Sequence, residues 1–375
     1  MSVLPGAGVI SFARGVPSPD MFPLEQLAES ARRAVQSHGR IALNYGPPAG
    51  FGPLRDWLGD RHGVAPERIL VTPGSMIGLN FLVSHVVGSG GRAAVESPTY
   101  DRMLHALGAV GADILTVDRS GDGLDLDGLR RLVTQGPRPS LLYVLPTFHN
   151  PTGRTLTLEQ RRGLVALALE HELLVLEDDP YGLLRVEGDP LPYVHELLRD
   201  AGGDHLALFA SSFSKSVAPG LRVGYLILPE ALVAPIEALA LLTYVSPPLL
   251  PQAQLYDFLA SGGFEPHLDF LRGFLRARRD ALLGVLAEEM PDGVTWTRPD
   301  GGYFLWLELP DGVDAQELNE RAQAAGVAIV PGAGFFTGDR GQTTARLAFS
   351  FPSVADVREG AHRLSTLVRA TVELL

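Results

Sequence analysis

The most informative segment of the chain is residues 211–225, with the sequence SSFSKSVAPGLRVGY. It lies between the apolar runs His205–Ala210 and Val223–Leu228, which both have the composition of buried strands. Lys215 stands there between hydroxyl residues, and Arg222 follows seven positions later. Such a lysine either belongs to a surface loop or is held where partial desolvation frees its amine as a nucleophile. Taken alone, the segment fits a surface loop better, because short motifs give many false positives.

Short apolar runs recur up to residue 228, mostly separated by segments of helix length. The seven runs are Ile69–Thr72, Ala93–Glu96, Ile114–Val117, Leu141–Leu145, Leu173–Glu177, Leu206–Ala210 and Val223–Leu228. This alternation predicts an α/β fold with a mostly parallel, seven-stranded sheet and helices on both faces. The last two runs are too close in sequence for a crossover helix, so we expect them to be antiparallel.

After residue 250 the pattern changes to that of a smaller α+β domain. It begins with a long helix, Pro266 to about Glu289, whose arginines 272, 276, 278 and 279 are expected to form a solvated face. Strand-like runs and two further helices follow. We therefore predict an N-terminal arm with part of the small domain in residues 1–40, a large domain in residues 41–255 and a small C-terminal domain in residues 256–375.

Composition narrows the classes of function. Apolar residues make up 46% of the chain and charged residues 20%, as in globular proteins. The formal charge of -12 argues against nucleic acid as the main partner. Without cysteine there is neither a disulfide nor a thiolate metal site. The start of the chain has no secretory signal, and the region Leu226–Leu250 is interrupted by proline and glutamate, which argues against a membrane span. A cytoplasmic protein is expected.

Four polar features follow shortly after predicted strands. Gly74 and Ser75 follow Ile69–Thr72, Asn150 follows Leu141–Leu145, Asp178 follows Leu173–Glu177, and Lys215 follows Leu206–Ala210. In an open α/β sheet, ligands bind in the crevice outside the carboxyl ends of the strands. The sequence therefore predicts that these four features meet in one ligand site.

The order of four motifs is similar to that of a known enzyme family. The motifs are Asn150-Pro151-Thr152-Gly153, Asp178-Asp179-Pro180-Tyr181, Ser212-Phe213-Ser214-Lys215 with Arg222, and Arg346 in the run Arg346–Ser350. Together they resemble the fold-type I, class I/II pyridoxal-phosphate aminotransferases. The nearest branch holds the 2-aminoadipate and kynurenine aminotransferases and the aminotransferase-like half of MocR-type regulators. The resemblance extends from Phe12 to the C-terminus, and four ordered motifs are more specific than any single one.

The resemblance implies a role for each polar residue around the cofactor ring. Lys215 would hold pyridoxal phosphate as a Schiff base and then act as general base and acid toward the substrate. Asp178 would pair with the pyridine nitrogen and keep it protonated, which makes the ring an electron sink. Asn150 and Tyr181 would donate hydrogen bonds to the phenolic oxygen of the ring, and Tyr100 would stack on its face.

The resemblance also implies where the cofactor phosphate and the substrate bind. The phosphate contacts would be Gly74, Ser75 and Met76 at a helix N-terminus, together with Ser212, Ser214 and Arg222. Arg346 would bind the substrate α-carboxylate with both ends of its guanidinium, beside Asn150 and Gly15. Tyr45 matches a tyrosine that reaches the phosphate of the neighbouring subunit in this family, which implies a homodimer with shared active sites.

Three residues depart from the pattern of the family. Arg14 stands where relatives often have glycine. It would either contact an acidic or polar substrate side chain or form a solvated or intersubunit ion pair, and the second role is the commoner one for such an arginine. His149 replaces a glutamine that is common before the Asn-Pro-Thr-Gly turn, and we expect a structural role. Met76 replaces a polar residue, which matters little where only its backbone N–H is used.

The function predicted from these features is the transfer of an amino group from an α-amino acid to a 2-oxo acid by a ping-pong reaction. One alternative is a ligand-sensing domain like that of MocR-type regulators, although the resemblance begins by Phe12 and leaves no room for their DNA-binding part. Another keeps the cofactor but changes the chemistry to that of a lyase, a decarboxylase or an oxidase. The ten histidines show no pair at metal-ligand spacing supported by carboxylates, so no metal site is expected.

Overall fold

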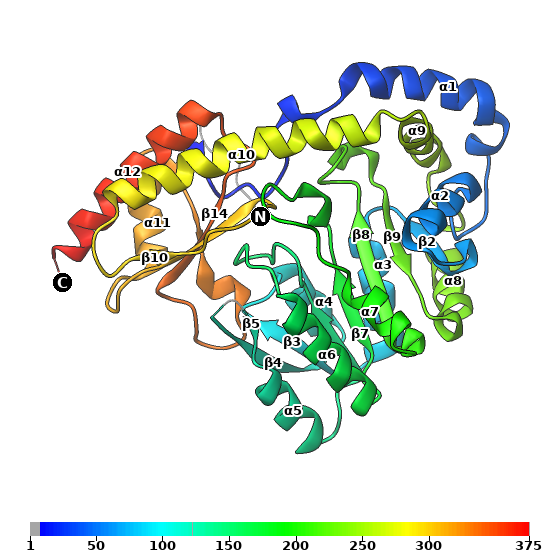
Figure 1. The fold of residues 1–375 in the computed structure, drawn as a ribbon, viewed down its shortest axis with the longest axis horizontal. Helices are drawn as coiled ribbons and strands as arrows, with labels where there is room; N and C mark the ends of the chain where they lie inside the picture. The colour runs from blue at the N-terminus through cyan, green and yellow to red at the C-terminus, as the bar shows by residue number, and fades with distance from the viewer. Residues whose placement is uncertain (1–7, 122, 375) are drawn as a thin grey trace.

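The computed structural model of the protein describes residues 8–121 and 123–374. Its largest element is an eight-stranded sheet with helices on both faces (Figure 1). In spatial order the strands are β2 (Ile69–Thr72), β9 (Gly224–Ile227), β8 (Ala207–Ser212), β7 (Val175–Asp178), β6 (Leu141–Val144), β3 (Arg92–Ser97), β4 (Asp113–Ser120) and β5 (Gly123–Leu124). The predicted α/β fold with a mostly parallel sheet is confirmed.

The predicted number of seven strands is one too low. All seven apolar runs form strands, and the eighth strand is β5, a two-residue strand at the edge of the sheet. Two residues are too few to form a recognisable apolar run, so the sequence pattern gives no signal for it. β8 and β9 are antiparallel, as their short connection predicts, and β9 also pairs antiparallel with β2.

Helices cover both faces of the sheet because its strands are apolar on both sides. In β6, Leu141 and Tyr143 pack into the core on one face, and Leu142 and Val144 pack into the core on the other. The first core includes α3 (Ser75–Leu82), α4 (Asp101–Ala109) and α8 (Glu230–Tyr244), and the second includes α5 (Leu126–Thr134), α6 (Leu158–Glu170) and α7 (Val194–Asp200). With both faces covered, a ligand has access at the carboxyl ends of the strands.

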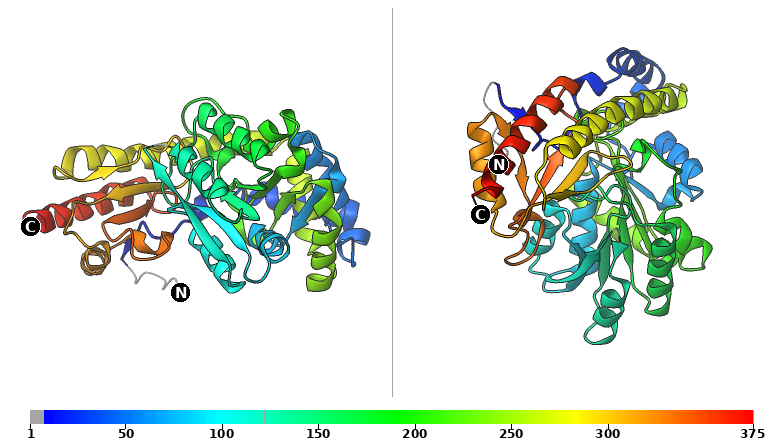
Figure 2. Two further views of the ribbon diagram at one scale, coloured as in Figure 1. Left: turned by 90° about the horizontal axis from the view of Figure 1, so that it is seen from below. Right: turned by 60° about the vertical axis from the view of Figure 1, so that its left-hand side comes forward.

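The C-terminal part forms a smaller α+β unit beside the large sheet (Figures 1 and 2). Its antiparallel sheet has the order β10 (Thr295–Trp296), β11 (Phe304–Glu308), β14 (Thr344–Ala348) and β13 (Val330–Pro331). Its helices are α10 (Phe264–Glu289), α11 (Ala315–Ala324) and α12 (Val354–Val372), and the long helices α10 and α12 lie side by side.

The N-terminal segment contacts both parts of the molecule. β1 (Ile10–Ser11) pairs in parallel with β12 (Val327–Ala328) of the smaller unit. α1 (Leu24–Ala42) packs instead along α9 (Leu249–Ala260), next to α2 (Gly52–His62) and the edge of the large sheet. Residues 11–23 therefore cross from one unit to the other. Among the described residues, no helix is both long and apolar enough to cross a membrane.

The solvated face that the sequence predicts for the four arginines of α10 is only partly present, because Arg276 is exposed and Arg272 is half-buried. Arg278 and Arg279 are buried, and each donates a hydrogen bond to a backbone carbonyl. Arg272 and Arg276 donate to carbonyls in the segment 183–186. Long side chains of this kind cover apolar surface with their stems while their charged ends satisfy backbone acceptors. These arginines thus attach α10 to the loops that it crosses.

Candidate active site

A cleft of about 530 Å³ lies at the carboxyl ends of the central strands, facing the smaller sheet and the N-terminal segment. It is lined by thirteen of the fifteen predicted site residues: Arg14, Gly15, Ser75, Met76, Tyr100, Asn150, Asp178, Tyr181, Ser212, Ser214, Lys215, Arg222 and Arg346. Gly74 lies directly behind Ser75. Tyr45 lies elsewhere and is 83% exposed. The structure therefore brings the four polar features of the strand ends together, as predicted.

Lys215 is the only lysine in the chain, and its amine lies inside the cleft. Its Nζ donates a hydrogen bond to the carbonyl of Gly15 at 2.8 Å and lies 5.7 Å from the centre of the Tyr303 ring. Burial lowers the pKa of Lys215 to about 8, and the positive charges of Arg346 and Arg222 act in the same direction. A lysine with a lowered pKa offers a free amine near neutral pH, which can attack a carbonyl group.

Asp178 is the last residue of β7 and is buried beside the cleft. Its Oδ2 accepts a hydrogen bond from the hydroxyl of Tyr143 at 2.7 Å, whereas Oδ1 has no partner among the described residues. Burial raises the pKa of Asp178 to about 6, although the hydrogen bond from Tyr143 opposes the shift. A buried carboxylate oxygen without a partner is costly, so Oδ1 indicates a place for an N–H group of a ligand.

Close packing at the start of α3 forms a corner between Gly74, Ser75, Ser212, Ser214 and Arg222. Gly74 has a φ of 85°, and a Cβ at this position would lie 2.1 Å from the guanidinium of Arg222. The first N–H groups of α3, beginning at Ser75, have no partner within the helix. Beside them lie the hydroxyls of Ser212 and Ser214, which are 2.9 Å apart. Backbone N–H groups at a helix start, hydroxyls and a guanidinium are the donors that bind a phosphate.

Arg346 enters the cleft from β14 of the smaller sheet. Its Nη1 donates to Asn150 Oδ1 at 2.9 Å, and its Nη2 donates to the carbonyl of Ala13 at 3.3 Å. The guanidinium carbon lies 4.3 Å from the centre of the Phe304 ring, and Nε has no partner among the described residues. Burial lowers the pKa of Arg346 from its ordinary value. A buried arginine that pairs with no carboxylate of the described chain has donors left for an anionic ligand.

Two tyrosines line the cleft beside these groups. Tyr181 is buried three residues after β7, and Tyr100 precedes α4. Burial raises the pKa of Tyr181 above its ordinary value and that of Tyr100 to about 12. Both hydroxyls therefore stay protonated at physiological pH and can donate a hydrogen bond to a ligand oxygen.

The residues that depart from the family pattern lie in different places. Arg14 lines the cleft and is half-buried, and its guanidinium carbon lies 4.3 Å from the centre of the Phe351 ring. His149 is fully buried, and its Nδ1 lies 2.8 Å from Thr152 Oγ1. This contact lies within the turn that carries Asn150.

Several aromatic residues of the site were not predicted from the sequence: Tyr143, Tyr303, Phe304 and Phe335. Tyr143 holds one oxygen of Asp178, and the Tyr303 hydroxyl donates to the backbone carbonyl of Lys215 at 2.7 Å. The two phenylalanines flank the guanidinium of Arg346. Aromatic residues in apolar segments are normally assigned to the core, so the pattern does not identify them. A tyrosine inside the buried run of β6 is the one available signal, because its hydroxyl needs a partner.

Comparison with known proteins shows the family. Residues 7–364 match the family model described as aminotransferase class I and II. A 2-aminoadipate transaminase of Thermus thermophilus is 36% identical over 98% of this chain and 92% of its own. An aromatic-amino-acid aminotransferase 1 of Thermococcus litoralis is 32% identical over 96% of this chain and 88% of its own. Relatives with these names support the prediction of an enzyme over that of a ligand-sensing domain.

Solved structures agree with this assignment. The crystal structure of the alpha-aminoadipate aminotransferase of Thermus thermophilus, complexed with N-(5'-phosphopyridoxyl)-L-leucine, has a TM-score of 0.93 at 36% identity, covering 98% of this chain and 94% of that one. The kynurenine aminotransferase of Pyrococcus horikoshii has a TM-score of 0.92 at 33% identity, covering 98% and 92%.

The donors of the cleft fit pyridoxal phosphate, which needs an anion corner for its phosphate, an amine for its aldehyde and an acceptor for its ring nitrogen. Lys215, the orphaned oxygen of Asp178 and the corner at Gly74 are the groups that would supply these three contacts. The chain belongs to the class I and II aminotransferase family and is a pyridoxal-phosphate-dependent enzyme that transfers amino groups between amino acids and 2-oxo acids.

Proposed function

We propose that the cleft residues carry out transamination in the roles that the family resemblance assigns to them. Bound pyridoxal phosphate supplies a ring that withdraws electrons from the substrate Cα. The amine of Lys215 would take the proton from this carbon as a base and later return it as an acid. The Oδ1 atom of Asp178 would accept the N–H of the ring. The observation that carries this proposal is the meeting of the only lysine of the chain with an orphaned buried carboxylate oxygen in one cleft.

The phosphate and ring oxygen have separate partners in this proposal. The phosphate binds to the N–H groups of Ser75 and Met76, to the two serine hydroxyls after β8 and to Arg222, whereas the N–H of Gly74 donates to the carbonyl of Thr72 at 2.6 Å. Asn150 and Tyr181 donate to the ring oxygen, and Tyr100 packs on the ring. Support comes from the raised pKa values of both tyrosines, which keep their protons available at the working pH.

Arg346 and Arg14 bind different parts of the substrate in this proposal. Arg346 binds the α-carboxylate next to Asn150 and Gly15. Arg14 is a further cation of the cleft, and among the described residues it forms no ion pair. We infer that it contacts a carboxylate at the end of the substrate side chain. A relative named for 2-aminoadipate, a dicarboxylic amino acid, is in keeping with this substrate class.

The enzyme is a homodimer with shared sites in this proposal. Tyr45 is 83% exposed, and apolar side chains are exposed both in its own segment, with Leu43 at 67%, and on α8, with Leu242 at 83%. The backbone N–H of Gly46 donates to Ser246 Oγ at 3.0 Å, which connects the segment around Tyr45 with the end of α8. An exposed apolar patch of this kind is typical of a protein interface. Through it, Tyr45 reaches the phosphate of the neighbouring subunit.

The substrate class is tested with purified holoenzyme and a panel of amino acids, following the change in absorbance from the pyridoxal to the pyridoxamine form of the cofactor. We expect a dicarboxylic amino acid to react faster than its ω-amide. Arg14→Gln should lower kcat/KM for the dicarboxylic substrate about 10- to 100-fold, the value of one hydrogen bond to a charged group. The same substitution should leave kcat/KM for the amide within about twofold.

Arg102→Gln provides the matched control, because Arg102 also lines the cleft but lies 3.8 Å from the carboxylate of Asp101. It should not alter the preference between acid and amide. An equal loss on both substrates in Arg14→Gln would contradict a contact with the side-chain carboxylate. Failure of every amino acid to convert the cofactor would contradict the assigned catalytic roles.

A further inference from the structure

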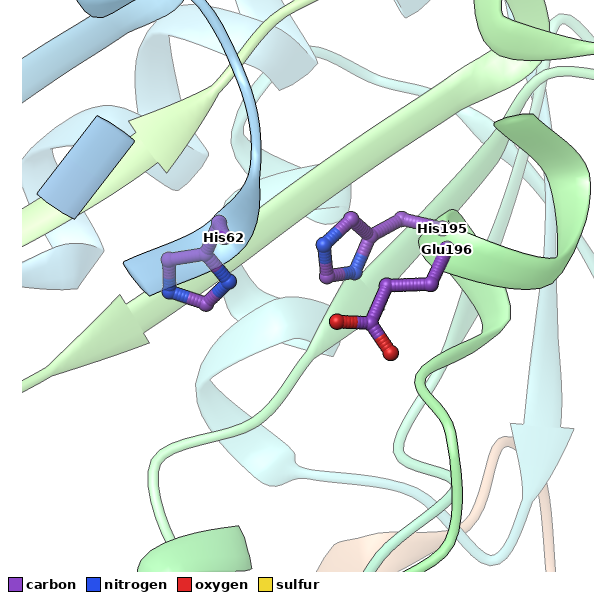
Figure 3. A group of neighbouring side chains, drawn as sticks. All are labelled: His62, His195 and Glu196. Atoms are coloured by element: carbon purple, nitrogen blue, oxygen red, sulfur yellow. The ribbon is translucent and has the colours of Figure 1, made fainter. Parts of the chain in front are cut away.

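Two histidines and a glutamate converge behind β7, on the side of the strand away from Asp178. His62 ends α2, whereas His195 and Glu196 lie in the first turn of α7. One ligand-type atom of each residue lies within 4.8 Å of the other two. Figure 3 shows the two imidazole rings facing each other, with the carboxylate of Glu196 beside them. This cluster has no part in the aminotransferase site described above.

Each histidine has one ring nitrogen with a partner and one without. His62 Nε2 lies 2.9 Å from the hydroxyl of Tyr225, and His195 Nδ1 lies 3.1 Å from Glu177 Oε2. The other two nitrogens, His62 Nδ1 and His195 Nε2, are buried and have no hydrogen-bond partner in the described part of the chain. The residues are only 5% and 4% exposed. Two buried ring nitrogens without partners in one place point to a ligand that both can bind.

The outer contact of His195 has a form that is common at metal sites. A metal-binding histidine typically donates its second ring N–H to a carboxylate, and the contact of His195 Nδ1 with Glu177 has this form. Glu177 is fully buried, and one of its oxygens has no partner. Its one ion-pair candidate among the described residues is His195 itself. A cation bound to His195 would balance this buried negative charge, which is otherwise costly.

We propose that His62 Nδ1, His195 Nε2 and the carboxylate of Glu196 bind a divalent transition metal. Zinc is the first candidate, because two imidazoles and a carboxylate form one of its common ligand sets. Glu196 is half-exposed, and its Oε2 accepts a hydrogen bond from the N–H of Tyr193 at 3.0 Å. The bound metal joins α2 to α7 across the back of the strand that ends in Asp178. Its role is to stabilise this part of the fold.

The aromatic surroundings fit the same role. The ring of Tyr193 stacks on His195 with centres 5.3 Å apart, and the ring of Phe209 lies 4.4 Å from the same imidazole. An apolar shell limits the access of water to a metal and keeps its ligands in place.

The test uses holoenzyme freed of metals with a chelator and then titrated with Zn²⁺ alone, with elemental analysis of the dialysed product. We expect one zinc per chain and a higher thermal midpoint in the presence of zinc. Glu196→Gln keeps an oxygen that can accept the Tyr193 N–H, so it should preserve the helix cap while weakening zinc binding at least about 10-fold. His62→Phe fills the aromatic cluster but removes a ligand, and it should abolish the binding.

The matched control is His205→Gln, which removes an exposed histidine that lies 3.1 Å from Glu172. Its zinc affinity and stoichiometry should equal those of the wild type. Absence of saturable binding at one zinc per chain would overturn the proposal. So would equal affinity and an equal rise of the thermal midpoint in the wild type and Glu196→Gln. Because Glu196 is half-exposed, this variant decides the question even where His62→Phe fails to fold.

Discussion

Asp178→Asn is expected to make the cofactor-free protein more stable and the enzyme less active. Without the cofactor, the Asp178 carboxylate is buried with one hydrogen bond from Tyr143 and one oxygen without a described partner. This burial raises the pKa of Asp178 from 3.8 to about 6. Since one pKa unit corresponds to about 1.4 kcal/mol, the ionised carboxylate destabilises the folded state by about 3 kcal/mol.

The pH dependence follows from the direction of this shift. Between pH 3.8 and about 6 the folded state binds more protons at this carboxyl than the unfolded state, so stability falls as the pH rises through this window. The cost is fully present above the folded pKa and is lost below the unfolded pKa. An asparagine has no charge to bury and can still accept the hydrogen bond of Tyr143. Asp178→Asn should therefore be more stable than the wild type by about 3 kcal/mol at pH 8 and by about half as much at pH 5.

The assay is urea unfolding of the cofactor-free protein at pH 8 and pH 5, followed by circular dichroism. Asp113→Asn is a matched control, because Asp113 is an exposed partner of Arg92 and its removal should change the free energy of unfolding by less than about 0.5 kcal/mol. With saturating cofactor the order should reverse, since an amide cannot hold the ring nitrogen protonated, and turnover should fall. A variant no more stable than the wild type at pH 8, or a difference equal at both pH values, would refute the reasoning.

Three further substitutions test the remaining proposals. Lys215→Ala should abolish turnover while the phosphate corner still retains cofactor, and retained turnover would exclude the catalytic role. Borohydride reduction of the cofactor-bound protein should label a lysine peptide in the wild type only. Arg346→Ala should lower kcat/KM for an amino acid about 30-fold or more but spare the matching amine that lacks the carboxylate; an equal loss for both would argue against the contact. Leu242→Glu should reduce the mass found by light scattering from twice 40.2 kDa to 40.2 kDa, whereas Phe270→Glu on α10 should not; a dimeric Leu242→Glu variant would remove this surface from the interface.

Most of the fold could be predicted from the sequence because strands buried on both faces form continuous apolar runs. Leu141–Val144 is such a run, and its residues pack alternately into two cores. β5 could not be predicted in this way, because its two residues pair with β4 by backbone hydrogen bonds and need no apolar pattern. Arg278 and Arg279 of α10 were misassigned for a related reason. Their charge predicts solvent, but a guanidinium can also be satisfied by backbone carbonyls of loops that are distant in sequence.

The polar part of the cleft was predictable because parallel strands place their carboxyl ends at one edge of the sheet. Asp178 of β7 is directly paired with Ala210 of β8. Lys215 comes shortly after Ala210 in the sequence, so it lies at the same edge of the sheet as Asp178. The supporting tyrosines were not predictable. Whether the hydroxyl of Tyr143 reaches a carboxylate depends on the register between β6 and β7, which pairs Tyr143 with Leu176. Register is a property of the assembled sheet and cannot be read from one strand.

Two adjacent residues at the end of β7 contact two different sites: Asp178 lines the cleft, and Glu177 contacts His195 of the proposed metal site. Successive side chains of a strand point to opposite sides, so Asp178 faces the cleft while Glu177 faces α7. Each carboxylate is buried, and each has one oxygen without a described partner. Two adjacent buried carboxylates destabilise a fold unless cationic groups accompany them. We infer that ligands fill this role at both positions: the ring nitrogen of the cofactor at Asp178 and the proposed metal, through His195, at Glu177. Ligands that bind the folded state alone stabilise it by mass action, so the strand that carries the active-site acid depends on both for its full stability.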